Sequence, residues 1–257
     1  MSPPSKEQRK SMVTQRPSRL SMEGYIFNAD HVLEIALDPA TKEIPKDIIE
    51  NCKGVVIITT VHAGALMTFH YGSGIVMAKR IDGTWSAPSA VTAAGYSMGA
   101  VVGGKTDCTL TFIMDDKTMM DFATRPQTRM GLDAAVSAGS AGGDANVGME
   151  APNRGTVTFT YTNGVFAGLS VLIGTLAHQN KQNVIFYSKD KVSPKSILID
   201  NEVEIPPDSQ VKDLHDKMKK LEQGDSWTPS AHDRQRSSRF LEMAQQQSQK
   251  FNSGDLK

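Results

Sequence analysis

The chain has 257 residues, with 28 basic and 28 acidic side chains, so no overall charge favours a nucleic-acid partner. A chain of this length can bury a substantial core as one large domain or two small ones. The amino-terminal residues lack the apolar segment of a secretory signal. The longest apolar stretch, residues 164–177, is too short to span a bilayer and is interrupted by glycine and serine. We therefore expect a cytoplasmic protein that meets membranes only from outside the hydrocarbon.

Both ends of the sequence have the composition of solvated tails. Residues 1–24 are rich in Pro and Ser, and residues 225–257 are rich in Ser and Gln, which leaves 25–224 as the predicted folded domain. The first tail is predicted to be a flexible end, with attraction to anionic lipid as the alternative. Its cations are Lys6, Arg9, Lys10, Arg16 and Arg19.

The order of predicted elements indicates an α+β fold. Two amino-terminal helices are expected, over 26–37 and over 43–54, the second with Lys53 in its last turn and Gly54 as its C-cap. Short β-rich runs punctuated by glycine follow, and helices return near the carboxyl end. We expect a mainly antiparallel sheet of many short strands, barrel-like or sandwich-like. The runs are 54–61, 64–71, 74–81, 107–114, 155–162 and 164–175, and the later helices are 115–124, 193–200 and 207–224.

The pentapeptide at residues 95–99, Gly-Tyr-Ser-Met-Gly, fits the Gly-x-Ser-x-Gly pattern of serine hydrolases. That pattern needs a strand, a sharp turn at the serine and then a helix. Here the following residues, Ala-Val-Val-Gly-Gly, favour continuation of a strand, and residues 54–114 offer no crossover helices. His178 is a nominal base only. We predict that Ser97 is not catalytic and that the chain is not an enzyme.

The glycines around Ser97 have a simpler explanation. Gly95, Gly99 and Gly103 recur at every fourth residue, so on a strand they share one face. Such a face lets another element pack close to the backbone. A small-residue helix interface is the alternative, and the neighbouring valines count against it.

No metal or cofactor site is predicted. Cys52 and Cys108 lack metal-ligand spacing and are expected to be reduced, buried thiols. His62 and His70 fall on neighbouring predicted strands, with no carboxylate or thiol at suitable spacing, so we interpret them as packing residues.

Several blocks of the sequence resemble the SYLF domain, also known as the yeast actin-patch or las seventeen-binding domain. They are Tyr-Gly-Ser-Gly-Ile-Val-Met-Ala-Lys-Arg-Ile-Asp-Gly-Thr-Trp-Ser-Ala-Pro-Ser-Ala-Val at 71–91, Thr-Asp at 106–107, and the blocks at 164–175 and 186–198. The likeness runs from about residue 25 to 201. Its motif positions, which we interpret as structural, are Gly72, Gly74, Asp82, Gly83, Trp85, Pro88, Ser89 and Asp107.

The resemblance implies a non-catalytic module that binds phosphoinositides, with actin binding and endocytic-site assembly in fungal members. Lys53, Lys79 and Arg80 match basic positions of the family and are the candidates for contact with lipid phosphates. A solvated strand end is the alternative. In this family a glycine commonly stands at the place of Ser97, which agrees with a close-packed strand.

The chain departs from the family at positions where positive charge is common. His62, Asn163 and Asp144 stand at or near such places, and the first predicted helix carries the acids Asp30, Glu34 and Asp38. These changes imply either an altered lipid preference or a lost binding function. The competing expectation is an actin-binding scaffold protein with little affinity for lipid.

Overall fold

The computed structural model describes residues 18, 20–39, 41, 44–137 and 155–224. It confirms the α+β class: helices precede and follow an antiparallel sheet with the order β1-β2-β4-β3. The strands are β1 (Gly54–Ala78), β2 (Ser89–Ile113), β3 (Gln127–Ser137) and β4 (Thr156–His178). The helices are α2 (Met22–Leu37), α3 (Lys46–Asn51), α4 (Asp116–Thr124), α5 (Asn180–Tyr187), α6 (Pro194–Leu198) and α7 (Val211–Gln223).

The sheet consists of long strands and not of many short ones. β1 and β2 are each 25 residues long, and they pair antiparallel from Gly54 opposite Ile113 to Val76 opposite Ser89. The predicted runs 54–61 and 64–71 and most of the run 74–81 are therefore parts of one strand, which ends at Ala78. β4 pairs with β2 along nearly its whole length and with β3 on its other side.

β1 bends back on itself near its middle. The register with β2 shifts between Ala65 and Met67, and Leu66 between them has a positive φ of 62°. Beyond the bend, the Cα of Gly74 faces the carbonyl oxygen of Ile57, so closely that an added Cβ would lie 1.9 Å from that oxygen. Gly72 lies in the same way against Thr60. The ends of β1 meet where the Lys79 N–H donates to the Lys53 carbonyl at 2.8 Å.

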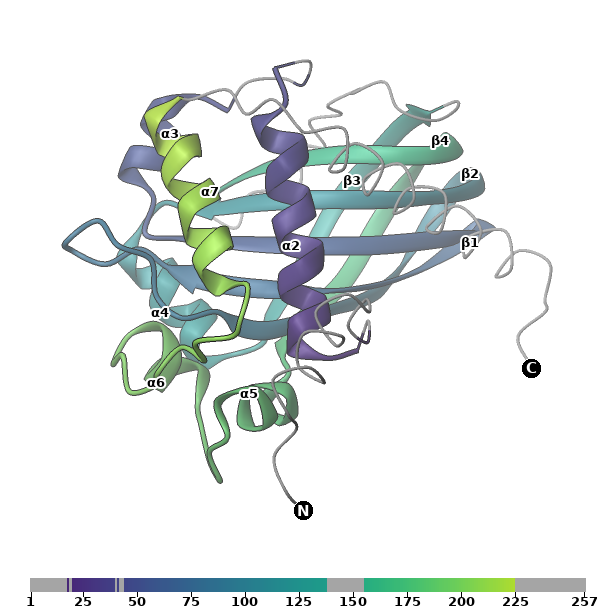
Figure 1. The fold of residues 1–257 in the computed structure, drawn as a ribbon. Coiled ribbons are helices and arrows are strands. Elements are labelled where there is room, and N and C mark those ends of the chain that lie inside the picture. Colours follow the sequence, from purple (N-terminus) through teal and green to yellow (C-terminus); the bar gives the residue numbers. More distant parts are fainter. Residues whose placement is uncertain (1–17, 19, 40, 42–43, 138–154, 225–257) are drawn as a thin grey trace, which may run out of the picture.

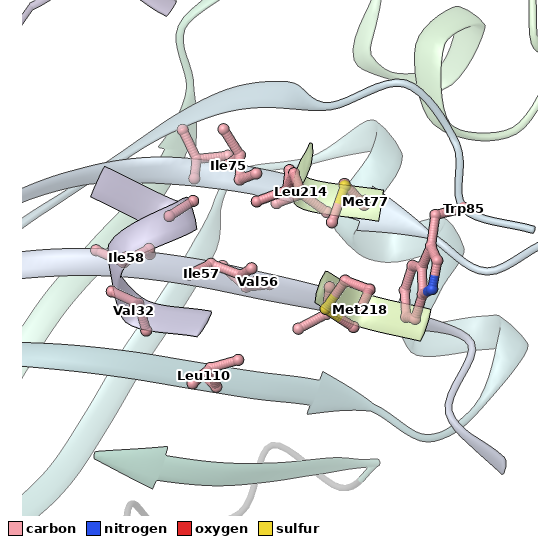
Figure 2. Close-up of a cluster of buried hydrophobic side chains, with 14 of the residues drawn as sticks. Val32, Val56, Ile57, Ile58, Ile75, Met77, Trp85, Leu110, Leu214 and Met218 are labelled. Carbon is pink, nitrogen blue, oxygen red and sulfur yellow. The ribbon is translucent and has the colours of Figure 1, made fainter. Parts of the chain in front are cut away.

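The core lies between the bent ribbon and the helices. Figure 1 shows α2 and α7 side by side across one face of the sheet, and α2 packs on both β1 and α7. Residues 55–58 are all buried, because this part of β1 is covered on both faces. Figure 2 shows side chains of α2, β1, β2 and α7 meeting there, with Trp85 at one side.

The helix ends differ from the prediction in identifiable ways. α2 begins at Met22, four residues before the predicted start, because Ser21 caps it by accepting the N–H of Gly24. α3 ends at Asn51, so Lys53 lies outside its last turn and Gly54 opens β1. Asp115 caps α4 as one of the two expected caps, and Gly224 ends α7 in a left-handed conformation.

Candidate functional site

The three candidate phosphate-binding cations lie together where the two ends of β1 meet, which we call the strand-end site (Lys53, Lys79 and Arg80). Lys53 is exposed, whereas Lys79 and Arg80 are half-buried. The backbone hydrogen bond between Lys79 and Lys53 fixes their spacing. The sequence prediction thus names residues that the fold brings together, although their side chains are not equally available.

The ammonium group of Lys79 is surrounded by protein groups. Its Nζ donates to the carbonyls of Ile49 at 2.9 Å and Glu50 at 3.1 Å, at the end of α3. It also lies 2.9 Å from the carboxylate of Glu222 in α7 and 5.9 Å from the centre of the Trp85 ring. Lys79 therefore joins α3 and α7 to the sheet, which leaves it little capacity for an external phosphate.

Arg80 opens a tight turn that ends at Thr84. The Gly83 N–H donates to the Arg80 carbonyl at 2.9 Å, and Gly83 has a positive φ of 81°. Asp82 accepts from both the N–H and the hydroxyl of Thr84, at 2.9 and 2.6 Å. The guanidinium of Arg80 donates to the side-chain oxygen of Asn201. Asp82 and Gly83 thus shape the turn that presents Arg80.

The remaining motif residues hold β2 to α5. Ser89 is fully buried, and its Oγ receives a hydrogen bond from Asn183 at 3.1 Å and lies 3.3 Å from Nδ1 of His178. Nε2 of His178 donates to the Phe122 carbonyl. The Pro88 carbonyl accepts the Tyr187 hydroxyl at 2.5 Å. These contacts join β2 to α5, and Trp85 is also buried.

Ser97 lies inside β2 and not at a turn between a strand and a helix. It pairs with Thr68 on one side and Leu172 on the other, and it is 1% exposed. His178 pairs with Val91, six residues along β2, which is about 20 Å from Ser97 at the rise of a strand. The strand interpretation of the Gly-Tyr-Ser-Met-Gly segment is confirmed.

Asp107 lies at the centre of a buried ionic cluster. Its Oδ2 lies 3.1 Å from Nε2 of His62 and 3.0 Å from Nζ of Lys105, and its Oδ1 accepts from Thr162 at 2.8 Å. Burial alone would raise the pKa of the Asp107 carboxyl, but His62 and Lys105 hold it well below its usual value. The expectation that His62 lacks a carboxylate partner is wrong, because Asp107 arrives from the neighbouring strand.

His62 and His70 pack against each other, as expected, but within one strand. Their rings are stacked at 5.3 Å between centroids, because the bend of β1 brings its two halves together. The described residues contain no group of three or more His, Cys, Asp or Glu side chains that would hold a metal ion. His62 is buried, so its difference from the basic residue common in the family does not alter the protein surface.

Two of the acids predicted for the first helix, Asp30 and Glu34, face the protein interior, whereas Asp38 caps the end of α2 and is half-buried. Asp30 and Glu34 each lie 2.7 Å from the ammonium of Lys217 in α7, with both carboxylates 5% exposed. Burial would raise the pKa of Glu34, but hydrogen bonds from His31 and Lys217 leave it below its usual value. The acidic character of this helix therefore fastens α2 to α7.

Sequence reasoning missed a set of exposed apolar side chains near the bend, which we call the outer apolar face (Met67, Phe69, Tyr71, Tyr96 and Met98). All five are at least 40% exposed. The alternation Met-Thr-Phe-His-Tyr at 67–71 was a usable signal. It was overlooked because alternation is normally interpreted as apolar side chains turned toward a core.

Some expectations fall outside the described residues. The tail cations Lys6, Arg9, Lys10, Arg16 and Arg19 lie there, as does Asp144. Asn163 is in β4 opposite Thr106. Among the described residues, no helix is long and apolar enough to cross a bilayer.

Comparison with known proteins decides the family. A family profile named Ysc84, described as "Las17-binding protein actin regulator", matches residues 94–221. An SH3 domain-containing protein of Schizosaccharomyces pombe is 30% identical over 227 residues, which are 83% of this chain and 52% of the relative. The chain belongs to the Ysc84 family. This family is the one that the sequence motifs resemble, so the recognition is confirmed.

Other members of the Ysc84 family are similar over the same region. Protein YSC84 of Saccharomyces cerevisiae is 33% identical over 185 residues, 71% of this chain and 37% of that protein. The human SH3 domain-containing YSC84-like protein 1 is 32% identical over 177 residues, 68% of this chain and 50% of that protein. The chain thus spans between about a third and a half of these relatives. No solved structure matches it.

Proposed function

We propose that this Ysc84-family chain is a non-catalytic binding module of the actin-regulatory machinery that docks on phosphoinositide-containing membranes at the cell cortex or on endosomes. Family membership carries the proposal, because the matching profile is described as an actin regulator that binds Las17. The position of Ser97 supports a non-catalytic role, since a serine inside a paired strand has no route to a substrate. No cofactor is required for binding of this kind.

The strand-end site supplies candidate contacts for lipid phosphates. Lys53 is exposed, and the turn at residues 80–84 presents Arg80 beside it. Lysine meets a phosphate as a point charge, and arginine can bind it through two parallel hydrogen bonds. The internal contacts of Lys79 assign it a positioning role within this site. The five tail cations add long-range attraction, at about 1 kcal/mol per cation near an anionic surface.

Vesicle flotation with the full chain tests the membrane function. Phosphatidylcholine–phosphatidylserine vesicles are compared with the same vesicles carrying phosphatidylinositol bisphosphate, at low and at physiological salt. We expect stronger binding with the phosphoinositide, and weaker binding of both kinds at higher salt. Equal binding to both vesicles, or binding to neither, would reject a phosphoinositide module.

Charge neutralisation tests the strand-end site. Lys53→Gln and Arg80→Gln are each expected to weaken phosphoinositide binding by about fivefold, which corresponds to roughly 1 kcal/mol per cation. Lys181→Gln removes an equal charge from an exposed position of α5 and serves as the control. A loss of equal size in the control would indicate a general effect of net charge and remove the site assignment.

The second candidate function is direct binding to actin filaments with little affinity for lipid, and the family's description as an actin regulator favours it. Co-pelleting of the full chain with filamentous actin distinguishes it from the membrane function. Pelleting with actin and absence from every vesicle fraction would establish this alternative in place of the membrane module.

A further inference from the structure

The turn that follows β1 carries a fully exposed apolar side chain. Ile81 is 109% exposed, more than any other large hydrophobic side chain among the described residues. Residues 81–84 are all exposed, and nothing lies within 4 Å of a Cβ added to Gly83. The turn therefore projects from the surface and leaves the whole side chain of Ile81 in water.

Hydrogen bonds hold this turn in one shape. At its base, the Ser86 N–H donates to the Ala78 carbonyl at 2.8 Å, and the Ala78 N–H donates to the Ser86 hydroxyl at 2.9 Å. Nearer the tip, the Arg80 N–H donates to the Thr84 carbonyl at 2.8 Å. Trp85, which follows Thr84, is buried at one side of the hydrophobic cluster (Figure 2). The exposed isoleucine is thus presented on a fixed support.

Charged side chains lie on both sides of the exposed isoleucine. Arg80 precedes it, and Lys53 is exposed where the two ends of β1 meet. Asp82 follows it as an anion, because hydrogen bonds from the hydroxyl and the N–H of Thr84, together with Arg80, hold the pKa of the Asp82 carboxyl below its usual value. Lys79 is already paired with a carboxylate of α7. Two cations and one anion therefore adjoin the tip, which leaves an excess of positive charge.

This combination fits a lipid surface better than a protein groove. The neighbours of Ile81 in the turn are polar residues and a glycine, so the tip offers one apolar side chain and no broad apolar area. A stable protein–protein contact buries roughly 800 Å² on each partner. A bilayer, by contrast, accepts single apolar side chains between its headgroups and supplies anionic phosphates for the cations beside them.

We propose that Ile81 enters the headgroup region of an anionic membrane while Arg80 and Lys53 bind lipid phosphates at the base of the turn. Single exposed apolar side chains are common on protein surfaces, but the fixed turn and the adjoining cations distinguish this one. The proposal rests on the membrane function above and adds an inserted tip and an orientation of the module. In this orientation the bend of β1 at Leu66 points away from the bilayer.

A site-specific fluorophore tests the contact directly. Ile81→Cys introduces an exposed thiol, whereas Cys52 and Cys108 are buried. The full chain, labelled there with an environment-sensitive dye, is mixed with vesicles of phosphatidylcholine, phosphatidylserine and phosphatidylinositol bisphosphate. We expect a blue shift and quenching by nitroxide-labelled acyl chains. A dye at Met98→Cys, beside the bend, is expected to show neither change. A response at residue 98 with none at residue 81 would show that the outer apolar face meets the membrane, and would overturn the proposal.

Substitution gives an independent measurement. Ile81→Ser is expected to weaken vesicle binding by roughly tenfold, at low and at physiological salt alike, because the lost contact is apolar and is not screened. Its thermal transition should be unchanged, since the side chain is fully exposed. Inositol trisphosphate, the soluble headgroup, should bind this variant as it binds the unaltered chain, because the cations are retained. Ile185→Ser, at a position of α5 that is 58% exposed, is the control and should bind vesicles normally.

The outcomes separate this proposal from the membrane function. If the unaltered chain binds no vesicles, both fail. If it binds, but Ile81→Ser binds equally well and the dye at residue 81 shows no change, the membrane function stands and the inserted tip is rejected. If Ile81→Ser loses the same affinity for the soluble headgroup as for vesicles, the residue supports the phosphate site and does not enter the bilayer. If the variant loses actin co-pelleting and keeps vesicle binding, the tip belongs to a protein partner and the proposal is overturned.

Discussion

The ammonium of Lys79 lies 2.9 Å from the carboxylate of Glu222, and this ion pair joins the end of β1 to the last turn of α7. Both side chains are largely buried, at 12% and 21% exposure. The same ammonium binds two carbonyls at the end of α3. Lys79 thus fixes two helices to the sheet beside Lys53, which is exposed, and Arg80, which is half-buried.

Lys79→Met is therefore expected to lower the free energy of unfolding by about 3 kcal/mol, because it leaves the Glu222 carboxylate partly buried without its cation. Chemical denaturation measures the change. Lys53→Met, at an exposed position, is the matched control and should alter stability by less than about 0.5 kcal/mol. Similar losses for both variants would show that the internal contacts of Lys79 contribute little.

Lys217→Met is expected to lower the free energy of unfolding by about 3–5 kcal/mol, because Asp30 and Glu34 would remain buried without the ammonium that both contact. Lys212→Met on the same helix removes a cation that is 83% exposed, and it should have little effect. Urea midpoints of the two variants test this. A normal midpoint for Lys217→Met would mean that the two acids do not depend on Lys217.

Gly74→Ala is expected to destabilise the fold by about 3 kcal/mol, the upper range for overpacking, because the added methyl would meet the backbone of residue 57 and not a movable side chain. Gly83→Ala serves as the comparison. Nothing lies within 4 Å of its added Cβ, so only its positive φ is penalised, by about 1 kcal/mol. The thermal midpoint should fall further for Gly74→Ala than for Gly83→Ala. The reverse order would contradict the close approach of the two halves of β1 at Gly74.

Stability should fall as the pH is lowered through and below about 6.5. Burial holds the pKa values of His178 and His215 below the usual 6.5, so the unfolded chain takes up protons in this range before the folded chain does. Their contribution is complete above pH 6.5 and is lost as the pH drops toward the folded-state values. Urea midpoints across this range measure the slope. His215→Gln keeps a donor for the Ser86 carbonyl and should flatten it.

Both native thiols should resist modification in the folded protein. Burial raises the pKa of Cys52 to about 11 and that of Cys108 to about 12, so neither forms appreciable thiolate at neutral pH. A chromogenic disulfide reagent should therefore react only at the rate of unfolding, with both cysteines becoming reactive together in denaturant. Rapid reaction of either thiol in the native state would contradict the packing around it.

The sequence predicts those parts of the fold that depend on local chemistry. Asp115 and Gly224 mark helix ends by their preferences for caps, and the β-rich composition of residues 54–61 and 107–114 predicts strands. Glycines were interpreted as breaks between strands. Gly72 and Gly74 instead lie inside β1, where the bend of the strand brings another backbone against them. α5 was not predicted, because its polar sequence Asn-Lys-Gln-Asn carries little helix signal.

In the candidate site, too, the sequence predicts features that depend on local motifs but not contacts between distant segments. The family motif named Lys53, Lys79 and Arg80 as phosphate-contact candidates, and Trp85 was expected to be structural. Pairings between distant segments had no local signal. Lys217 is 187 residues from Asp30, and Asp107 reaches His62 only through the pairing of β2 with β1. Whether a charge is free or neutralised depends on such contacts, so the acids of α2 were mistaken for a surface feature.

The bend at Leu66 also determines how much of the chain can fold cooperatively. The two halves of β1 together pair with nearly the whole length of β2. If either half of β1 is missing, the corresponding half of β2 therefore lacks its hydrogen-bonded neighbour on that side. The stretch shared with the family profile begins at residue 94, after both halves of β1 and after α2. Residues 94–221 therefore identify the family, but we do not expect them to fold without β1 and α2. Assembly must wait for segments far apart in the chain to meet, which favours slow, all-or-none formation of the native state.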